Sequence, residues 1–313
     1  MIAGVKAGEQ IAGGVGARGR PLTALEQWGI EVILWIQSFR NPFLDGLFGF
    51  LSALGTESFY ILFLPLVYWC LSREAGLGLG LVFLLGDYIN GCVKDFFGLP
   101  RPSADRVAVL WPETSPGFPS GHAQNAVVLW GYVAARWRRP LTLALAVLMP
   151  LGIGLSRLYL GAHFPHDVLG GWLLGLAVLL LFLWGARRAA GLALGTGAAL
   201  AVVLLVPLTL LALHPGAGAV RDTALLAGLG LGVMAERRLV RFDVRGRAGR
   251  RALRFIAGLA VLAALYAGLK LLLPADPVYR FLRYFLLGLW GTWGAPWLFI
   301  RCGLARRESR MSV

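Results

Sequence analysis

Two histidines and an aspartate stand in short polar segments of a chain that is otherwise strongly apolar. His122 directly follows Pro-Ser-Gly, and His163 precedes Asp167 by four positions, which is about one helical turn. The carboxylate of Asp167 can therefore accept from one ring nitrogen of His163 and leave the other nitrogen as a nucleophile. Because the pKa of histidine lies near neutrality, His122 suits a general acid that later activates water. These residue types predict nucleophilic group transfer.

Three cations accompany these groups and predict an anionic ligand. Lys94 and Arg101 lie in one polar segment, and Arg157 lies at the start of another, directly after Ser156. The planar fork of arginine can grip phosphate oxygens through two parallel hydrogen bonds, and lysine adds a compact charge. Ser120 is a natural N-cap, so the backbone N–H groups that follow it, from Gly121 onward, point outward and form an anion site with the helix dipole. The implied ligand is a phosphate group.

The carboxylates in the loops near these polar segments do not form the cluster that a two-metal site requires. They are scattered over Asp95, Asp105, Glu113 and Asp167. We therefore expect no metal and no other cofactor, with cations and amides neutralising the charge of the transition state instead.

The composition indicates a polytopic membrane protein. Hydrophobic residues make up 58% of the 313 positions and charged residues only 15%, which is too apolar for an ordinary soluble domain. The formal charge of +14 could suggest nucleic acid, but the arginines stand in short clusters between apolar runs. They are better interpreted as topology signals, so we expect a lipid bilayer as the partner and no nucleic acid.

Nine apolar segments are long enough to be predicted as membrane-spanning helices. They are residues 57–72, 74–93, 122–137, 141–159, 167–187, 190–213, 219–236, 252–274 and 281–301. The runs at 28–40 and 43–55 are less regular and predict an interfacial or re-entrant element. We expect a flexible tail over 1–27, a membrane core over 28–187 and a C-terminal transmembrane extension over 188–313, which also offers a surface for a homodimer.

The arginine clusters predict the orientation of these spans. Basic residues gather at Arg136 to Arg139, at Arg187 and Arg188, and from Arg237 to Arg254, all on one face if the spans alternate. By the positive-inside rule this face is cytoplasmic, together with the C-terminus. The three polar segments, residues 94–102, 119–122 and 156–167, then lie on the extracytoplasmic side of a multi-pass protein of the cell (inner) membrane.

Taken together, the motifs Lys-x6-Arg-Pro, Pro-Ser-Gly-His and Ser-Arg-x5-His-x3-Asp resemble the signature of the type 2 phosphatidic acid phosphatase family. The resemblance covers residues 43–187. It implies an all-α membrane bundle with a six-span phosphatase core, here followed by about four additional C-terminal helices, that dephosphorylates lipid phosphates or diphosphates without metal. The run GTESFYILFLPLVYWC and the C-terminal spans also look like a bacterial group related to sphingosine 1-phosphate phosphatases.

The resemblance also implies a role for each motif residue. His163 would form a phosphohistidine, Asp167 would orient it, and His122 would protonate the leaving group. The phosphate would be held by Lys94, Arg101, Ser120, Gly121 and Arg157.

The sequence leaves the substrate and the acceptor open. Phosphatidate, phosphatidylglycerol phosphate, undecaprenyl diphosphate and sphingoid phosphates are all compatible with these residues. A phosphotransferase would use the same groups with a lipid or sugar hydroxyl in place of water. A lipid transporter that only binds headgroups is less favoured, because it has no need for the pairing of His163 with Asp167.

Overall fold

The computed structural model describes residues 22–308, and this range consists of helices joined by loops. The predicted all-α class is confirmed, since the described range holds no strand and only one isolated antiparallel bridge, between Phe242 and Arg307. Residues 1–21 of the predicted tail lie outside the described residues. The helices are α1 (Ala24–Gln37), α2 (Pro42–Ala53), α3 (Glu57–Leu66), α4 (Arg73–Phe97), α5 (Gly121–Trp137), α6 (Pro140–Tyr159), α7 (Pro165–Ala189), α8 (Thr196–Leu213), α9 (Ala217–Ala235), α10 (Ala248–Leu272), α11 (Pro277–Leu289) and α12 (Ala295–Arg301), with π-helical turns η1 (Val67–Leu71), η2 (Glu236–Val240) and η3 (Trp290–Gly294).

The chain is a multi-pass membrane protein. Within the described range six helices are long and apolar enough to cross a bilayer: α4, α6, α7, α8, α9 with η2, and α10. A seventh span arises if α2 and the α3–η1 helix, which are bent by 55°, are taken as one. The predicted span 122–137 corresponds to α5, a regular helix of only 17 residues. The predicted span 281–301 is helical but interrupted, because η3 separates α11 from α12.

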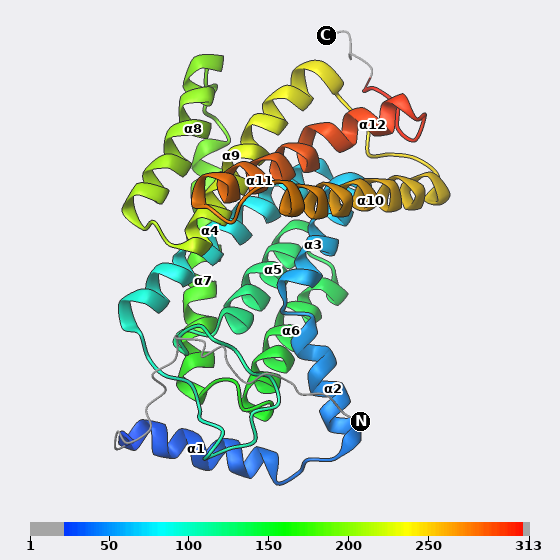
Figure 1. The fold of residues 1–313 in the computed structure, drawn as a ribbon. Helices are drawn as coiled ribbons and strands as arrows, with labels where there is room; N and C mark the ends of the chain where they lie inside the picture. Colours follow the sequence, from blue (N-terminus) through cyan, green and yellow to red (C-terminus); the bar gives the residue numbers. More distant parts are fainter. Residues whose placement is uncertain (1–21, 309–313) are drawn as a thin grey trace, which may run out of the picture.

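Helix α5 packs against α6, α7 and α4 (Figure 1). The approach of α5 to α7 depends on two glycines. A Cβ at Gly171 would lie 2.5 Å from the carbonyl oxygen of Ser120, and one at Gly175 would lie 2.6 Å from that of Gln124. The small-residue pair seen in the sequence therefore allows backbone-to-backbone packing, as expected for membrane helices.

Helix α1 lies across the end of the bundle at which α5 and α7 begin (Figure 1). It starts at Ala24, inside the segment predicted as a tail, because Thr23 and Glu26 form a capping box. At its other end, the Gln37 side chain donates to the carbonyl oxygens of Ala108, at 2.7 Å, and Tyr159, at 2.9 Å. Helix α1 thereby ties the long 98–120 loop to the end of α6.

The C-terminal helices gather toward the opposite end of the molecule from α1 (Figure 1). Helix α9 packs on α4 and on α11, so it joins the extension to the core. Helices α8 and α10 pack little against the rest of the protein, since only 6% of the most apolar stretch of each helix is buried. Their apolar side chains therefore face outward, as lipid-facing helices do.

Candidate active site

The three polar segments converge at the end of the bundle crossed by α1. Six structural elements meet there: the last turns of α4 and α6, the first turns of α5 and α7, and the loops 98–120 and 160–164. The residues singled out from the sequence lie on these elements: Lys94 on α4, Arg101 on the loop, Ser120, Gly121 and His122 at the start of α5, Arg157 on α6, His163 between α6 and α7, and Asp167 on α7.

His163 is held by the carboxylate four positions after it. Its Nδ1 lies 3.4 Å from Oδ2 of Asp167, and both side chains are essentially buried. The same Oδ2 accepts a hydrogen bond from the backbone N–H of Phe164 at 2.9 Å. Asp167 is the third helical residue of α7 and reaches back to the N-cap, so one carboxylate caps the helix and orients the ring.

The contacts of His163 define which nitrogen carries the proton. Nε2 lies 2.9 Å from Nη1 of Arg101, and a guanidinium can only donate. Nε2 must therefore accept, so the proton of the neutral ring is on Nδ1 and faces Asp167. This tautomer leaves the lone pair of Nε2 on the side of the cations, where an anionic ligand would bind.

His163 lies in the loop between two spans, and its surroundings keep the ring uncharged. Burial lowers the pKa of His163 well below its ordinary value of 6.5, and Arg101, Arg157 and Lys94 lower it further. A neutral imidazole is the form that can act as a nucleophile.

The two arginines share a carboxylate that the sequence did not place in the site. Glu113, on the 98–120 loop, lies 2.7 Å from Nη2 of Arg101 through Oε2, and its Oε1 pairs with Nη2 of Arg157. Arg157 is fully buried and also donates to Oγ of Ser52 at 2.5 Å. In the sequence Glu113 is one of several scattered carboxylates and Ser52 does not stand out, because neither residue belongs to a periodic pattern or a recognisable motif.

His122 stands beside the same carboxylate. Its Nδ1 lies 3.8 Å from Oε1 of Glu113, and its buried Nε2 has no hydrogen-bond partner among the described residues. Glu113 therefore links the two rings: it neighbours His122 directly and reaches His163 through Arg101.

The start of α5 provides backbone donors. Ser120 is the N-cap, and its Oγ lies 3.5 Å from the N–H of Ala123. Its own N–H donates to the carbonyl oxygen of Asp167 at 2.9 Å, which fixes α5 against α7. The first N–H groups of a helix have no intrahelical acceptor, so those of Gly121 and His122 can donate to a bound anion.

Amide side chains brace this arrangement one turn deeper. Gln124 donates to the carbonyl oxygen of Gly86 at 2.6 Å and accepts from Asn90 at 2.8 Å. These bonds join α5 to α4 next to His122 and Lys94. Lys94 itself donates to the carbonyl oxygen of Pro116 at 2.5 Å, so it is directed toward the 98–120 loop.

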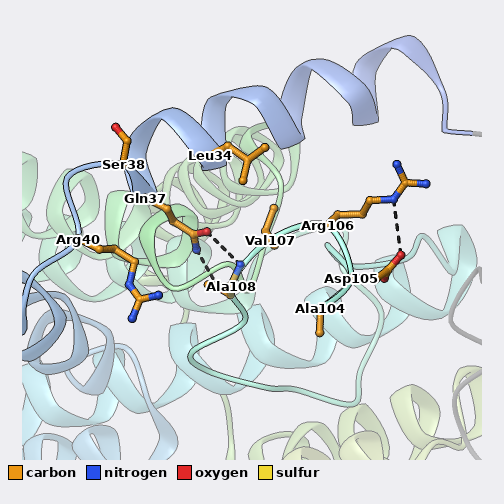
Figure 2. A pocket seen from close by; sticks show the side chains of 9 residues that line it. All are labelled: Leu34, Gln37, Ser38, Arg40, Ala104, Asp105, Arg106, Val107 and Ala108. Carbon is orange, nitrogen blue, oxygen red and sulfur yellow. Dashed lines mark hydrogen bonds and ion pairs between the residues drawn. The ribbon is translucent and has the colours of Figure 1, made fainter.

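An open groove on the same loop is lined by neither His122 nor His163. It has a volume of about 490 Å³ and runs between the end of α1 and residues 104–108 of the loop (Figure 2). Figure 2 shows Gln37 reaching the backbone of Ala108 and Arg106 paired with Asp105 at this groove. None of the residues predicted to act in the chemistry lines it, so we do not assign it to the active site.

His166 is adjacent to Asp167 in the sequence, but its ring packs away from the three cations of the site. Its ring stacks on Phe164, with 5.3 Å between centroids, and Nε2 lies 3.4 Å from Oδ1 of Asp167. His166 therefore neighbours Oδ1 of Asp167, the oxygen that does not face His163, and not the cations.

Two sequence profiles match the chain. Residues 75–190 match the PAP2 superfamily, and residues 220–307 match the profile described as PAP2 superfamily phosphatase, transmembrane extension. The chain belongs to the PAP2 superfamily. The family expected from the three motifs is thus confirmed, and the second profile accounts for most of the C-terminal helices.

Several proteins similar to this chain are named phosphatases. A dihydrosphingosine 1-phosphate phosphatase of Schizosaccharomyces pombe is 35% identical over 164 residues, which cover 48% of this chain and 40% of that protein. Lipid phosphate phosphatase delta of Arabidopsis thaliana is 34% identical over 50% of this chain and 41% of its own length. The chain thus matches about two fifths of the length of these relatives. Among solved structures, the transmembrane PAP2 type phosphatidylglycerolphosphate phosphatase from Bacillus subtilis has 26% identity and a TM-score of 0.47, covering 53% of this chain and 88% of that one.

Proposed function

We propose that this PAP2 protein is a metal-independent phosphatase for lipid phosphates or diphosphates that works through a phosphohistidine on His163. The observation that carries the proposal is the orientation of this ring, with Nδ1 on Asp167 and Nε2 among the cations. A transporter would need only the cations.

In the first step, Nε2 of His163 forms a bond to phosphorus while the bond to the leaving oxygen breaks. Lys94, Arg101 and Arg157 neutralise the equatorial oxygens, and the N–H groups at the start of α5 donate to them. His122 gives its proton to the leaving oxygen, so the lipid alcohol departs neutral. The positive charge that develops on the His163 ring is stabilised by Asp167.

In the second step, His122 takes a proton from water as the water oxygen bonds to phosphorus. The bond between nitrogen and phosphorus breaks, inorganic phosphate leaves, and both rings return to their starting states. One histidine thus serves as acid and then as base, which proton balance requires.

The substrate we propose is a lipid whose phosphate reaches the site from the bilayer. Phosphatidate, phosphatidylglycerol phosphate, undecaprenyl diphosphate and sphingoid phosphates remain the candidates. The names of the yeast and plant relatives, which specify dihydrosphingosine 1-phosphate and lipid phosphate, support this class.

We place the site on the extracytoplasmic face of the cell membrane and the C-terminus in the cytoplasm. Helices α5 and α7 begin at the site and end in arginines, at Arg136 and at Arg187 with Arg188. The positive-inside rule supports a cytoplasmic position for these ends. A homodimer through the C-terminal helices also remains a prediction, consistent with the outward apolar faces of α8 and α10.

Purified protein tests the activity directly. With EDTA present, we expect release of inorganic phosphate from at least one member of the lipid panel, and incorporation of oxygen from labelled water into that phosphate. His163→Ala should lower the rate by at least about 10³-fold, because it removes the nucleophile. Activity that is lost with EDTA and restored by magnesium would overturn the metal-free mechanism, and wild-type rates in His163→Ala would overturn the covalent one.

A further inference from the structure

We infer that Glu113 is a specificity-determining residue that exchanges with the substrate phosphate and then favours lipids that carry an ammonium group close to that phosphate. The inference rests on the proposed phosphatase function. It assigns a role to a carboxylate that neither the three motifs nor the mechanism uses.

Glu113 takes the donors that a phosphate would need. Its two oxygens engage the Nη2 groups of Arg101 and Arg157, and it lies 3.8 Å from Nδ1 of His122. Carboxylate and phosphate present similar pairs of oxygens to a guanidinium, so they compete for the same donors. A substrate phosphate held by the Nη2 groups of both arginines must therefore displace Glu113.

The structure allows this displacement but keeps Glu113 close. Its side chain is 22% exposed whereas that of Arg157 is 0% exposed, so the carboxylate can move and the arginine cannot. The loop is anchored on both sides, by the N–H of Leu110 on the carbonyl oxygen of Leu160, at 2.9 Å, and by Arg101 on that of Ser115, at 2.6 Å. Because both sides of the loop are fixed, the displaced carboxylate must stay close to the site.

The displaced carboxylate would lie on the side of His122, where the leaving alcohol departs. A carboxylate beside a phosphate dianion is a like-charge pair, which opposes binding. An ammonium group two carbons from the phosphate, as in an amino-alcohol phosphate, would pair with the carboxylate and remove this penalty. An uncharged headgroup offers no such compensation, so Glu113 should discriminate between the two.

A matched pair of lipids tests the inference: a sphingoid base 1-phosphate and its N-acylated form, which has the same phosphate but no ammonium. Wild-type protein should show the higher kcat/KM with the ammonium form. In Glu113→Gln this preference should fall about tenfold, and inorganic phosphate should bind about tenfold more tightly, since a charge pair of about 1.4 kcal/mol corresponds to a factor of ten. Glu113→Ala makes the same two predictions and serves if the amide variant does not fold.

Asp105→Asn is the control, because Asp105 lies on the same loop, is 69% exposed and pairs with Arg106 outside the site. It should leave both the preference and phosphate binding unchanged. Equal kcat/KM for the two lipids in wild type, an unchanged preference in Glu113→Gln, weaker phosphate binding, or the same shifts in Asp105→Asn would each overturn the role of Glu113. Hydrolysis of other lipid phosphates but of neither member of this pair would also overturn the role of Glu113. If wild type hydrolyses no lipid of the panel, the proposed function fails instead, and equilibrium binding of inorganic phosphate still tests the exchange.

Discussion

The protonation of His163 is set by its burial among cations, and this determines how activity should depend on pH. A nucleophile must be unprotonated, so His163 is fully reactive above its pKa, and its contribution to activity falls as the pH drops through that pKa. Because burial, and then Arg101, Arg157 and Lys94, lower that pKa well below 6.5, protonation of His163 should cause no loss of kcat/KM between pH 8 and pH 6.5.

Replacing Arg101, the cation that contacts the His163 ring, tests whether the cations lower the pKa of this ring. Arg101 lies 2.9 Å from Nε2 of His163, so Arg101→Gln should raise the pKa of the ring and move the acid limb of the residual kcat/KM profile to higher pH. His214→Ala is the control, since its ring pairs with Asp95 and not with the site. If kcat/KM of the wild type already fell with decreasing pH above pH 7, and Arg101→Gln did not move this fall, the cations would not control the pKa of His163.

At the scale of helices, the contact of α5 with α7 should control both stability and activity. Gly171→Ala places a Cβ 2.5 Å from the carbonyl oxygen of Ser120, so the helices must separate. We expect the free energy of unfolding to fall by about 2 kcal/mol, which is typical of overpacking, with loss of activity because Ser120 and Asp167 move apart. Gly185→Ala on the same helix meets nothing within 4 Å and should be neutral or more stable. Equal effects of the two substitutions in a detergent denaturation series would argue against close packing.

A second helix contact joins the C-terminal extension to the core. Arg221 of α9 pairs with Asp87 of α4, with Glu57 of α3 at 3.2 Å and with its neighbour Asp222. Arg221→Gln leaves these carboxylates without a cation, so we expect a loss of about 2 kcal/mol in unfolding free energy. Arg187→Gln, on an exposed turn of α7, should change stability little. Full stability of Arg221→Gln in the same denaturation series would show that the extension is held by apolar packing alone.

For the molecule as a whole, the helices and the meeting of the site motifs could be predicted from the sequence, but the course of the 98–120 loop could not. Apolar length identified α4, α6 and α7 to within a few residues, because the bilayer demands long uninterrupted helices. The motifs also predicted that His122 and His163 meet at one end. The position of Glu113 could not be predicted, since a loop without periodicity gives no signal for a contact with Arg157, which lies 44 positions further along the chain.

The arginine cluster of 237–254 shows a further limit of sequence patterns. It was interpreted as a topology signal, but Arg254 is fully buried and donates to the carbonyl oxygen of Trp69 at 2.8 Å. Glu236 likewise pairs with Arg73 at 2.9 Å. Charges near a span end can thus hold helices together as well as orient them, and composition alone does not separate the two roles.

The central claim is that the phosphoryl group passes through Nε2 of His163, and trapping this species tests it most directly. An activated aryl phosphate needs no proton on its leaving group, so His122→Ala should still be phosphorylated by it but should release phosphate slowly. After rapid quenching with labelled substrate, we predict an acid-labile, alkali-stable label on the tryptic peptide of residues 158–187, located at His163 by fragmentation and absent in His163→Ala. Label on His166, or continued turnover without any protein-bound phosphate, would contradict the account.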